Sequence, residues 1–471
     1  QTIEPTLKRA LEGASFITAF DRIAILRVLG VQPKTFDATA AHELAVKQGL
    51  GVVVSGSVER QGSGYSVAMK ATGTLTGNVL ADLKGRASSK DQILGTATRL
   101  VASVRKALGD EATESAQIFA MTNLSATSLD VVAHYTAAQE AASRNKFEEA
   151  RDHALKAVEL DPNFGIGYQV LSVASRNMHN QEDADKYAKA ALSHIDGMTE
   201  RERYTTRGYF LRLSGDYQGC VKEYGELVTR FAADVVGRNQ HALCSTQLRN
   251  FKPAIDEMRG VVDMLPNRAT FRDNLAIYLN YAGDFQGAEK EARTIQEPDA
   301  YATLAIAFAQ LGQGKVEEAI ASYNRMAGIG NVGALFAPLA LGDAAAVQGR
   351  YSDAVLSLTE GARTDLEGKN AGRAATKYAA IAYTQLSRGQ NAAAIASADQ
   401  VLANTTRGEI RFLAARVFVE TGAIAKAEPL MASLSADLRP ELQAYGKIIQ
   451  ADIALKRNIA RDAIKPLNEA N

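Results

Sequence analysis

The chain has 471 residues, of which 53 are Lys or Arg and 53 are Asp or Glu, with 46% hydrophobic and 23% charged residues. These proportions are those of an ordinary globular protein, so they exclude collagen-like, low-complexity and disordered chains. The net charge of zero provides no basic excess to neutralise phosphates. Nucleic acid is therefore not an expected partner.

Cysteine content and hydropathy limit the classes of site and membrane association. Two cysteines, Cys220 and Cys244, are too few for a disulfide framework or a four-ligand zinc site. We expect both to be buried free thiols, with a single Cys220–Cys244 bridge as the alternative. The most apolar stretch, 333–349, is interrupted by Pro338 and Asp343, so no membrane-spanning segment is expected. Gln1 is not an initiator Met and the next residues carry charges, which suggests a processed or excised portion without a signal peptide.

The first 115 residues mix helical and strand patterns. Helical spacing of apolar residues predicts helices over Thr6–Leu11, Asp21–Leu29, Thr39–Gln48 and Asp91–Leu108. β-Branched residues from Val52 and alternating apolar residues after the Ser63-Gly64 turn predict a β-hairpin, followed by a strand over 77–85. We predict a small α/β domain over 1–115, with a mixed, mostly antiparallel sheet, and then a linker over 116–130.

From residue 131 to the end, small residues recur at regular intervals of about 34 residues. The mid-repeat position holds nine alanines and one cysteine: Ala150, Ala184, Cys220, Ala254, Ala288, Ala319, Ala354, Ala394, Ala427 and Ala463. Twelve residues before each lies a second small residue: Ala138, Ser172, Gly208, Ala242, Ala276, Ala307, Gly342, Ala382, Ala415 and Ala451. Two helices in a hairpin can approach closely only where both carry minimal side chains. The pattern therefore predicts about ten helical hairpins, with repeats that start near 131, 165, 201, 235, 269, 300, 335, 375, 408 and 444.

These repeats resemble the tetratricopeptide repeat family, an all-α solenoid in which small residues occupy the eighth and twentieth of 34 positions. Pro162 and Pro266 match the family's proline near position 32, and turns such as Gly215-Asp216-Tyr217 match its hairpin turn. The family's Trp at the fourth position is absent, because the chain has no Trp. The resemblance implies a scaffold that binds a protein or peptide ligand in a concave groove.

A second resemblance covers the whole chain. The stretches 15–29, 56–65, 88–94, 124–129 and 200–209 are similar to the region that follows the kinase domain in a group of bacterial Ser/Thr protein kinases. There, a transmembrane helix precedes a domain similar to the N-terminal domain of TolB, followed by tetratricopeptide repeats. Two features depart from that group: the domain's first strand would lie before Gln1, and Ala232 replaces a proline. The resemblance implies an extracytoplasmic, periplasmic location, with a cytoplasmic one as the alternative.

Sequence motifs for catalysis or cofactor binding are incomplete. Gly328–Gly333 has dinucleotide-binding spacing but follows a predicted helix instead of a strand. Gly312–Lys315 lacks both the first glycine of a phosphate-binding loop and the Ser or Thr that follows its lysine. His42-Glu43 begins a zinc-protease motif whose second histidine is replaced by Val46. No kinase signature occurs in the chain. We therefore predict no enzyme activity, no cofactor and no metal site.

The family register places the second, fifth, ninth and twelfth residues of each first helix in the groove; we call these the groove positions. In repeats two to five the candidate binding residues are mostly polar: Arg176, Tyr209, Arg212, Asn239, Asp273 and Asn280. In repeats six to nine they are mostly aromatic: Tyr301, Phe308, Phe336, Tyr383, Phe412 and Arg416. We predict a non-catalytic interaction scaffold. The alternatives are the sensory portion of a membrane-anchored Ser/Thr kinase and a small-molecule sensor that uses the α/β domain.

Overall fold

The computed structural model describes residues 4–20, 25, 37–111, 128–144, 146–178, 180–296, 298–368, 370–437 and 439–470. The predicted helix over Asp21–Leu29, apart from residue 25, and most of the predicted linker over 116–130 lie outside these ranges. The chain forms two compact units, Gln1–Phe271 and Arg272–Asn471. None of the described helices is long and apolar enough to cross a membrane.

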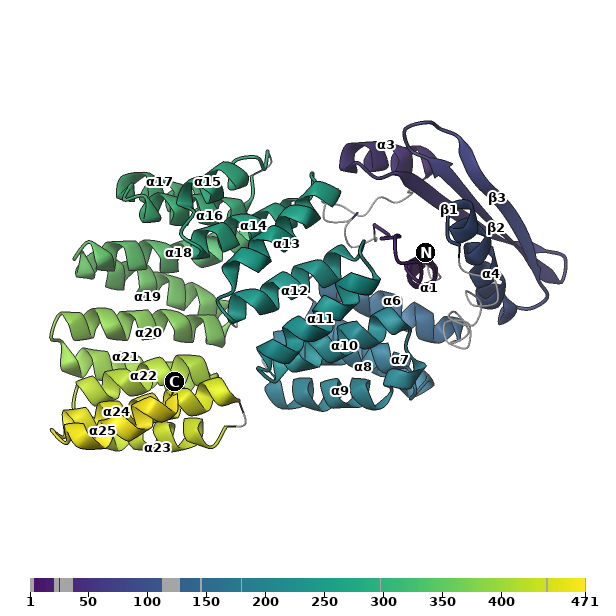
Figure 1. Cartoon of the computed structure of the whole chain (residues 1–471). Coiled ribbons are helices and arrows are strands. Elements are labelled where there is room, and N and C mark those ends of the chain that lie inside the picture. The colour runs from purple at the N-terminus through teal and green to yellow at the C-terminus, as the bar shows by residue number, and fades with distance from the viewer. Residues whose placement is uncertain are drawn as a thin grey trace. The chain divides into compact units, whose positions relative to one another are not determined.

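The first unit begins with a three-stranded sheet and its helices (Figure 1). Its elements are α1 (Glu4–Leu11), α3 (Ala38–Gln48), β1 (Val52–Gln61), β2 (Gly64–Gly73), β3 (Val79–Ala87) and α4 (Gln92–Ala107). The strand order is β1-β2-β3, with Val58 opposite Val67 and Met69 opposite Leu83. All three described strands pair antiparallel, as the predicted mostly antiparallel sheet requires, and the described strands include no parallel pair that would make the sheet mixed. Short turns join consecutive strands, and such turns permit only antiparallel pairing.

The core of this sheet region lies against β2. Val67, Met69 and Ala71 alternate along the strand and are buried, as the sequence pattern predicted. Helix α4 packs Val101 and Val104 against Met69 and Ala71, and it packs Ile93 and Ala97 around Val67. Helix α1 contributes Ala10 and Leu11 to the first of these clusters. Helix α1 is therefore part of the sheet region, although it also contacts α6 in the first hairpin.

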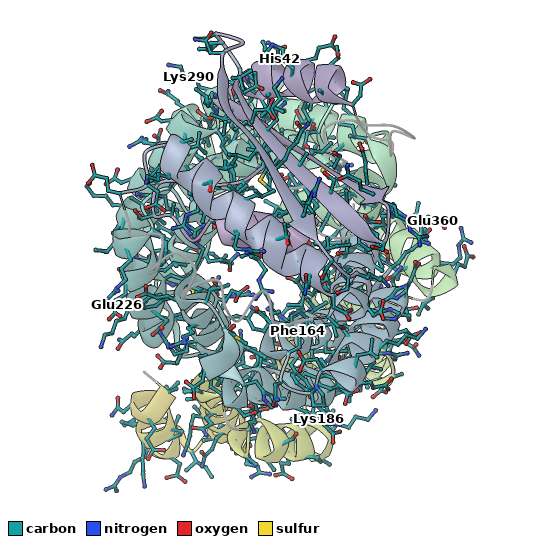
Figure 2. The ribbon with its side chains drawn as sticks, turned by 90° about the vertical axis from the view of Figure 1, so that its right-hand side faces the viewer. His42, Phe164, Lys186, Glu226, Lys290 and Glu360 are labelled. Atoms are coloured by element: carbon teal, nitrogen blue, oxygen red, sulfur yellow. A yellow bond between two sulfur atoms is a disulfide. The ribbon has the colours of Figure 1, made fainter. Side chains whose placement is uncertain are left out.

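The rest of the first unit consists of helical hairpins. They are α6 (Leu129–Ser143) with α7 (Phe147–Leu160), α8 (Gly165–Asn177) with α9 (Gln181–Ser193), α10 (Glu200–Leu213) with α11 (Tyr217–Arg230), and α12 (Val235–Gln247) with α13 (Phe251–Met264). A short 3-10 helix over Ile195–Gly197 follows α9. Figure 2 shows Lys186 of α9 and Glu226 of α11 on the outside of the ribbon, where both side chains are exposed.

The second unit is made of hairpins alone, and its first helix begins in the last residues of the first unit. The pairs are α14 (Ala269–Tyr281) with α15 (Phe285–Ala292), α16 (Ala300–Gly312) with α17 (Val316–Ala327), α18 (Gly330–Val347) with α19 (Tyr351–Glu367), α20 (Ala371–Ser387) with α21 (Asn391–Asn404), α22 (Gly408–Glu420) with α23 (Ile424–Ser435), and α24 (Pro440–Lys456) with α25 (Ala460–Ala470). The described chain thus forms helical hairpins of the predicted solenoid type.

Small residues set the spacing inside each hairpin. Every mid-repeat Ala or Cys and every small residue twelve positions earlier is buried. At the two first-helix positions held by glycine, the neighbouring helix fills the space of a side chain. A Cβ atom at Gly208 would lie 2.5 Å from the Tyr224 ring, and one at Gly342 would lie 2.5 Å from Leu358. The observed packing therefore has the steric cause that the sequence predicted.

The hairpin turns use a left-handed residue after the first helix. Gly215, Gly283 and Gly349 have φ angles of 81°, 82° and 75°. Glycine adopts this conformation without a steric penalty, which explains its recurrence at the turns. Among the turns that the structure describes, two have a residue other than glycine in this conformation, with Arg249 at φ 58° and Asn458 at φ 60°.

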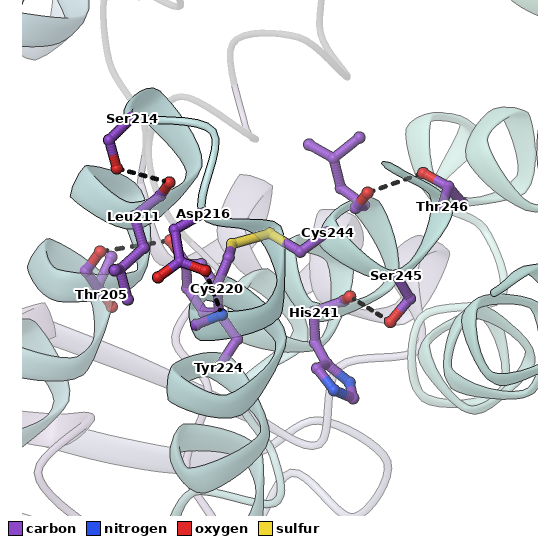
Figure 3. Close-up of a disulfide and its surroundings, with 12 residues drawn as sticks. Thr205, Leu211, Ser214, Asp216, Cys220, Tyr224, His241, Cys244, Ser245 and Thr246 are labelled. Atoms are coloured by element: carbon purple, nitrogen blue, oxygen red, sulfur yellow. Dashed lines mark hydrogen bonds between the residues drawn. A yellow bond between two sulfur atoms is a disulfide. The ribbon is translucent and has the colours of Figure 1, made fainter. Parts of the chain in front are cut away.

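The two cysteines form a disulfide bond, so the expectation of free thiols is wrong. Cys220 lies on α11 and Cys244 on α12, and their Cα atoms are 6.0 Å apart (Figure 3). Cys220 is the one non-alanine at the mid-repeat position, where close helix packing brings its side chain against the next hairpin. That proximity makes the bridge geometrically accessible, and it covalently joins two consecutive hairpins of the first unit.

Candidate partner-binding face

In the first unit, groove positions of neighbouring helices form a polar cluster. Tyr209 of α10 is buried, and its hydroxyl lies 3.3 Å from Ser172 Oγ of α8. The Arg212 guanidinium lies 5.4 Å from the Tyr209 ring centroid. Burial, together with the positive charge of Arg176, lowers the pKa of Arg212. Three predicted binding residues are thus close together, whereas Asn239 is half-buried further along on α12.

Other groove positions of the first unit are covered by the chain's own N-terminal segment, residues 4–20. The Arg9 guanidinium of α1 forms an ion pair with Glu202, at the second position of the third repeat, and its Nη2 donates to Glu202 Oε2 at 2.9 Å. It also lies 5.9 Å from the Phe164 ring centroid. Phe164 packs edge-to-face on Tyr135, the fifth position of the first repeat. Figure 2 shows Phe164 within the ribbon of these hairpins. Sequence reasoning did not find this docking.

Arg201 completes the attachment of the N-terminal segment. Its side chain donates to the backbone carbonyl oxygens of Ala14 and Ile17, at 3.4 and 3.5 Å. It also pairs with Asp234 at 3.4 Å and lies 4.7 Å from the Phe231 ring centroid. A basic side chain held by carboxylates and an aromatic ring therefore occurs twice on this face.

In the second unit, aromatic side chains of consecutive first helices meet. Tyr301 of α16 lies 6.1 Å from Phe336 of α18, measured between ring centroids. Phe308 of α16 lies at the same centroid distance from Tyr281 of α14. Tyr301 and Phe336 are 47% and 38% exposed, whereas Phe308 is half-buried. The first two rings thus expose apolar surface on the first helices of neighbouring hairpins.

Aromatic contact also links the last hairpins. Phe412 of α22 stacks on Tyr445 of α24, with ring centroids 4.3 Å apart. Arg416 donates to Asp452 Oδ2 at 3.2 Å, and Tyr383 is half-buried on α20. Sequence reasoning did not select Tyr445. The signal was present, because Tyr445 is the second residue of the predicted tenth repeat.

Two buried acceptors lie on α14, at groove positions seven residues apart. Asp273 is 6% exposed, and its Oδ1 has no hydrogen-bond partner among the described residues. Asn280 is 3% exposed; its Nδ2 donates to Ala305 O of α16 at 2.9 Å, and its Oδ1 has no described partner. Burial raises the pKa of Asp273 to about 8, and the charge of Asp299 adds to the shift.

Among the residues that the structure describes, no group of three or more His, Cys, Asp or Glu side chains could hold a metal ion. A small hollow with a cavity volume of about 40 Å³ lies in the last hairpins, lined by residues that include Arg411, Leu434, Asp437 and Leu442. This volume is far below the roughly 300 Å³ at which small-molecule pockets begin.

Comparison with known proteins gives only distant structural similarity. No family model matches the chain, and no curated protein matches it. It is similar to PilW, a widely conserved type IV pilus biogenesis factor, with 16% identity over 42% of this chain and 92% of that one and a TM-score of 0.36. It is also similar to a tetratricopeptide repeat protein from Parabacteroides merdae, with 15% identity over 49% and 92% of the two chains and a TM-score of 0.38. It is similar as well to yeast Tom70, with 11% identity over 79% of this chain and 91% of that one and a TM-score of 0.43.

Proposed function

We propose that this protein is a non-catalytic scaffold of the tetratricopeptide repeat type that binds a protein or peptide at the groove positions of its first helices. The observation that carries the proposal is the pair Tyr301 and Phe336, whose rings lie 6.1 Å apart on the first helices of consecutive hairpins and are nevertheless 47% and 38% exposed. Clustered exposed aromatic side chains are typical of interaction surfaces. Burial of both rings under a partner would supply the binding energy.

The test begins with random peptides of about 12 residues, which span roughly 40 Å when extended. These peptides are selected against the full chain, and their dissociation constants are measured by fluorescence anisotropy. A Tyr301→Ala, Phe336→Ala double variant should bind at least about tenfold more weakly, since each buried aromatic ring contributes about 1–3 kcal/mol. Because both rings are partly exposed, the variant should melt like the parent protein.

Leu356→Ala is the matched control, because Leu356 is 74% exposed on the second helix α19. It removes apolar surface from the same unit but not from a groove position, so peptide affinity should not change. Undiminished binding by the double variant would contradict the proposal. If changes in the strand pair Gly56–Met69 abolished binding instead, the sheet region would be the recognition site.

We also propose an extracytoplasmic location, supported by the Cys220–Cys244 bridge. Disulfides persist in oxidising compartments and are rare in the cytoplasm. Thiol alkylation of protein from intact cells, followed by mass spectrometry, should find both cysteines protected until a reductant is added. Labelling of both thiols without reductant would contradict this location. The kinase-associated sensory role and the small-molecule role of the sheet region stay predictions.

A further inference from the structure

We propose that the groove positions of α14 and α16 form a recognition site for a basic side chain, lysine or arginine, of the bound peptide. Asp273 receives the cation, Asn280 accepts a second hydrogen bond, and Tyr301 and Phe336 cover the apolar part of the segment. The inference rests on the proposed function, because it names the chemistry of the ligand that the scaffold binds.

The first argument is the state of the two acceptors. A buried carboxylate or amide oxygen without a partner is costly, and native proteins satisfy nearly all such atoms. Neighbouring Asp299 shows the usual arrangement, because its Oδ1 accepts from the backbone N–H groups of Tyr301 and Ala302 at 2.7 and 3.0 Å. Asp273 Oδ1 and Asn280 Oδ1 have no described donor. A ligand that brings two donors would satisfy both atoms.

The second argument is charge. Helices α14, α16 and α18 contain one basic residue, Arg272, and it is paired with Glu291 of α15. The other ionisable groups on these helices, apart from tyrosines, are Asp273 and Asp343, and Asp299 caps the start of α16. Apart from the capping Asp299, the acidic groups Asp273 and Asp343 have no ion-pair partner among the residues that the structure describes, and their surroundings are apolar and aromatic. Such a surface favours a cationic ligand over an anionic one.

The third argument comes from the first unit, where the chain itself provides a bound basic side chain. Arg9 lies between the Glu202 carboxylate and the Phe164 ring, with Glu202 at a groove position. The second unit has the same kinds of group at its groove positions, a buried carboxylate on α14 and exposed aromatic rings on α16 and α18, but Asp273 has no ion-pair partner in the described part of the chain. The chemistry that holds Arg9 in one unit is therefore available to a ligand in the other.

The spacing of the acceptors constrains the peptide. Asp273 and Asn280 are two helical turns apart, which corresponds to about 10.5 Å along the helix axis. An extended peptide covers that distance in about three residues. We therefore expect a basic residue in the ligand, and a hydrogen-bond donor three positions from it.

Peptides selected on the full chain as described above provide the test. Each binder should contain Lys or Arg, and its replacement by the neutral analogue norleucine or citrulline should weaken binding by about tenfold or more. Asp273→Asn should weaken binding of the basic peptide to a similar extent. The neutral analogue should bind the parent protein and Asp273→Asn with the same affinity. Asp353→Asn on the second helix α19, an exposed carboxylate, is the matched control and should change nothing.

Proton release is a second readout that a purely structural role would not produce. Binding of a cation requires Asp273 to ionise, and its pKa in the free protein is about 8, raised by burial and then by Asp299. Affinity should therefore rise between pH 6 and about pH 8.5 in the parent protein and stay flat in Asp273→Asn. Calorimetry in buffers of different ionisation enthalpy should detect the released proton.

The possible outcomes separate this inference from the proposed function. Binders that depend on Tyr301 and Phe336 but lack a basic residue, or that bind Asp273→Asn equally well, would overturn the cation site and leave the scaffold function standing. Failure to select any peptide would overturn both. A folding defect is checked separately by thermal melting of Asp273→Asn. This isosteric change removes a buried carboxyl and should not lower stability at pH 7.

Discussion

Replacement of Gly208 by Ala tests the register on which the whole hairpin series is built. A Cβ atom at this position would lie 2.5 Å from Tyr224 Cε2 and 2.8 Å from both Cδ2 and Cζ. Unstrained carbon atoms lie about 3.5–4.0 Å apart, so helix or ring must move by about 1 Å. Tyr224 is among the largest fully buried side chains and has no open space to enter. We expect an overpacking penalty of about 1–3 kcal/mol.

Gly260→Ala in α13 is the matched control, because nothing lies within 4 Å of its Cβ position. Both variants gain the same helix propensity, about 1 kcal/mol over glycine, so the difference between them isolates the steric penalty. Urea unfolding is monitored by circular dichroism. Gly260→Ala should raise the unfolding midpoint above that of the parent protein. The midpoint of Gly208→Ala should lie below that of Gly260→Ala by the equivalent of about 1–3 kcal/mol in unfolding free energy. Equal shifts of the two midpoints would refute the steric account of the repeat.

Three further changes test other parts of the fold. Cys220→Ala with Cys244→Ala should lose about 3.5 kcal/mol of unfolding free energy, the chain-entropy value for a sequence separation of 24, and an unchanged urea midpoint would contradict it. Asp365→Ala should lower the free energy of unfolding measured by thermal melting by about 3–5 kcal/mol, because it leaves the buried Lys377, its ion-pair partner at 2.6 Å and 4% exposed, without a counter-charge. The double variant Asp365→Leu with Lys377→Met should lose much less stability, because it removes both charges. Arg249→Gly should raise the free energy of unfolding by about 1 kcal/mol, because the backbone φ of 58° at this position strains any residue with a Cβ atom. A urea midpoint below that of the parent protein would contradict this expectation.

The repeat architecture could be predicted because its determinants are local. A hairpin needs a small residue at each contact point of its two helices and a left-handed turn between them, and both leave regular marks in the sequence. Ala254 and Gly208 show the first determinant, and Gly215 shows the second. The strand alternation at Val67 and Met69 is equally local. The antiparallel pairing of the strands was predictable for the same reason, because the Ser63-Gly64 turn joins the first two of them directly.

The candidate site was predictable only as a list of positions. The register selected Tyr301 and Phe336, but their mutual contact and exposure depend on how α16 and α18 pack. Asp273 was selected as a groove residue, whereas its burial without a partner could not be inferred, since desolvation is a property of surrounding atoms. Tyr445 was missed although the same register would have selected it.

The amino-acid sequence by itself determined the class of fold, because helix pairing in this chain is decided by side-chain size at short and regular intervals. Tertiary structure alone decided what joins distant segments. Arg9 and Glu202 are 193 residues apart, and the Cys220–Cys244 bridge joins consecutive hairpins that periodicity does not connect. The physical reason is that such contacts depend on which surfaces the packed hairpins bring together, and burial and charge pairing then act on that geometry.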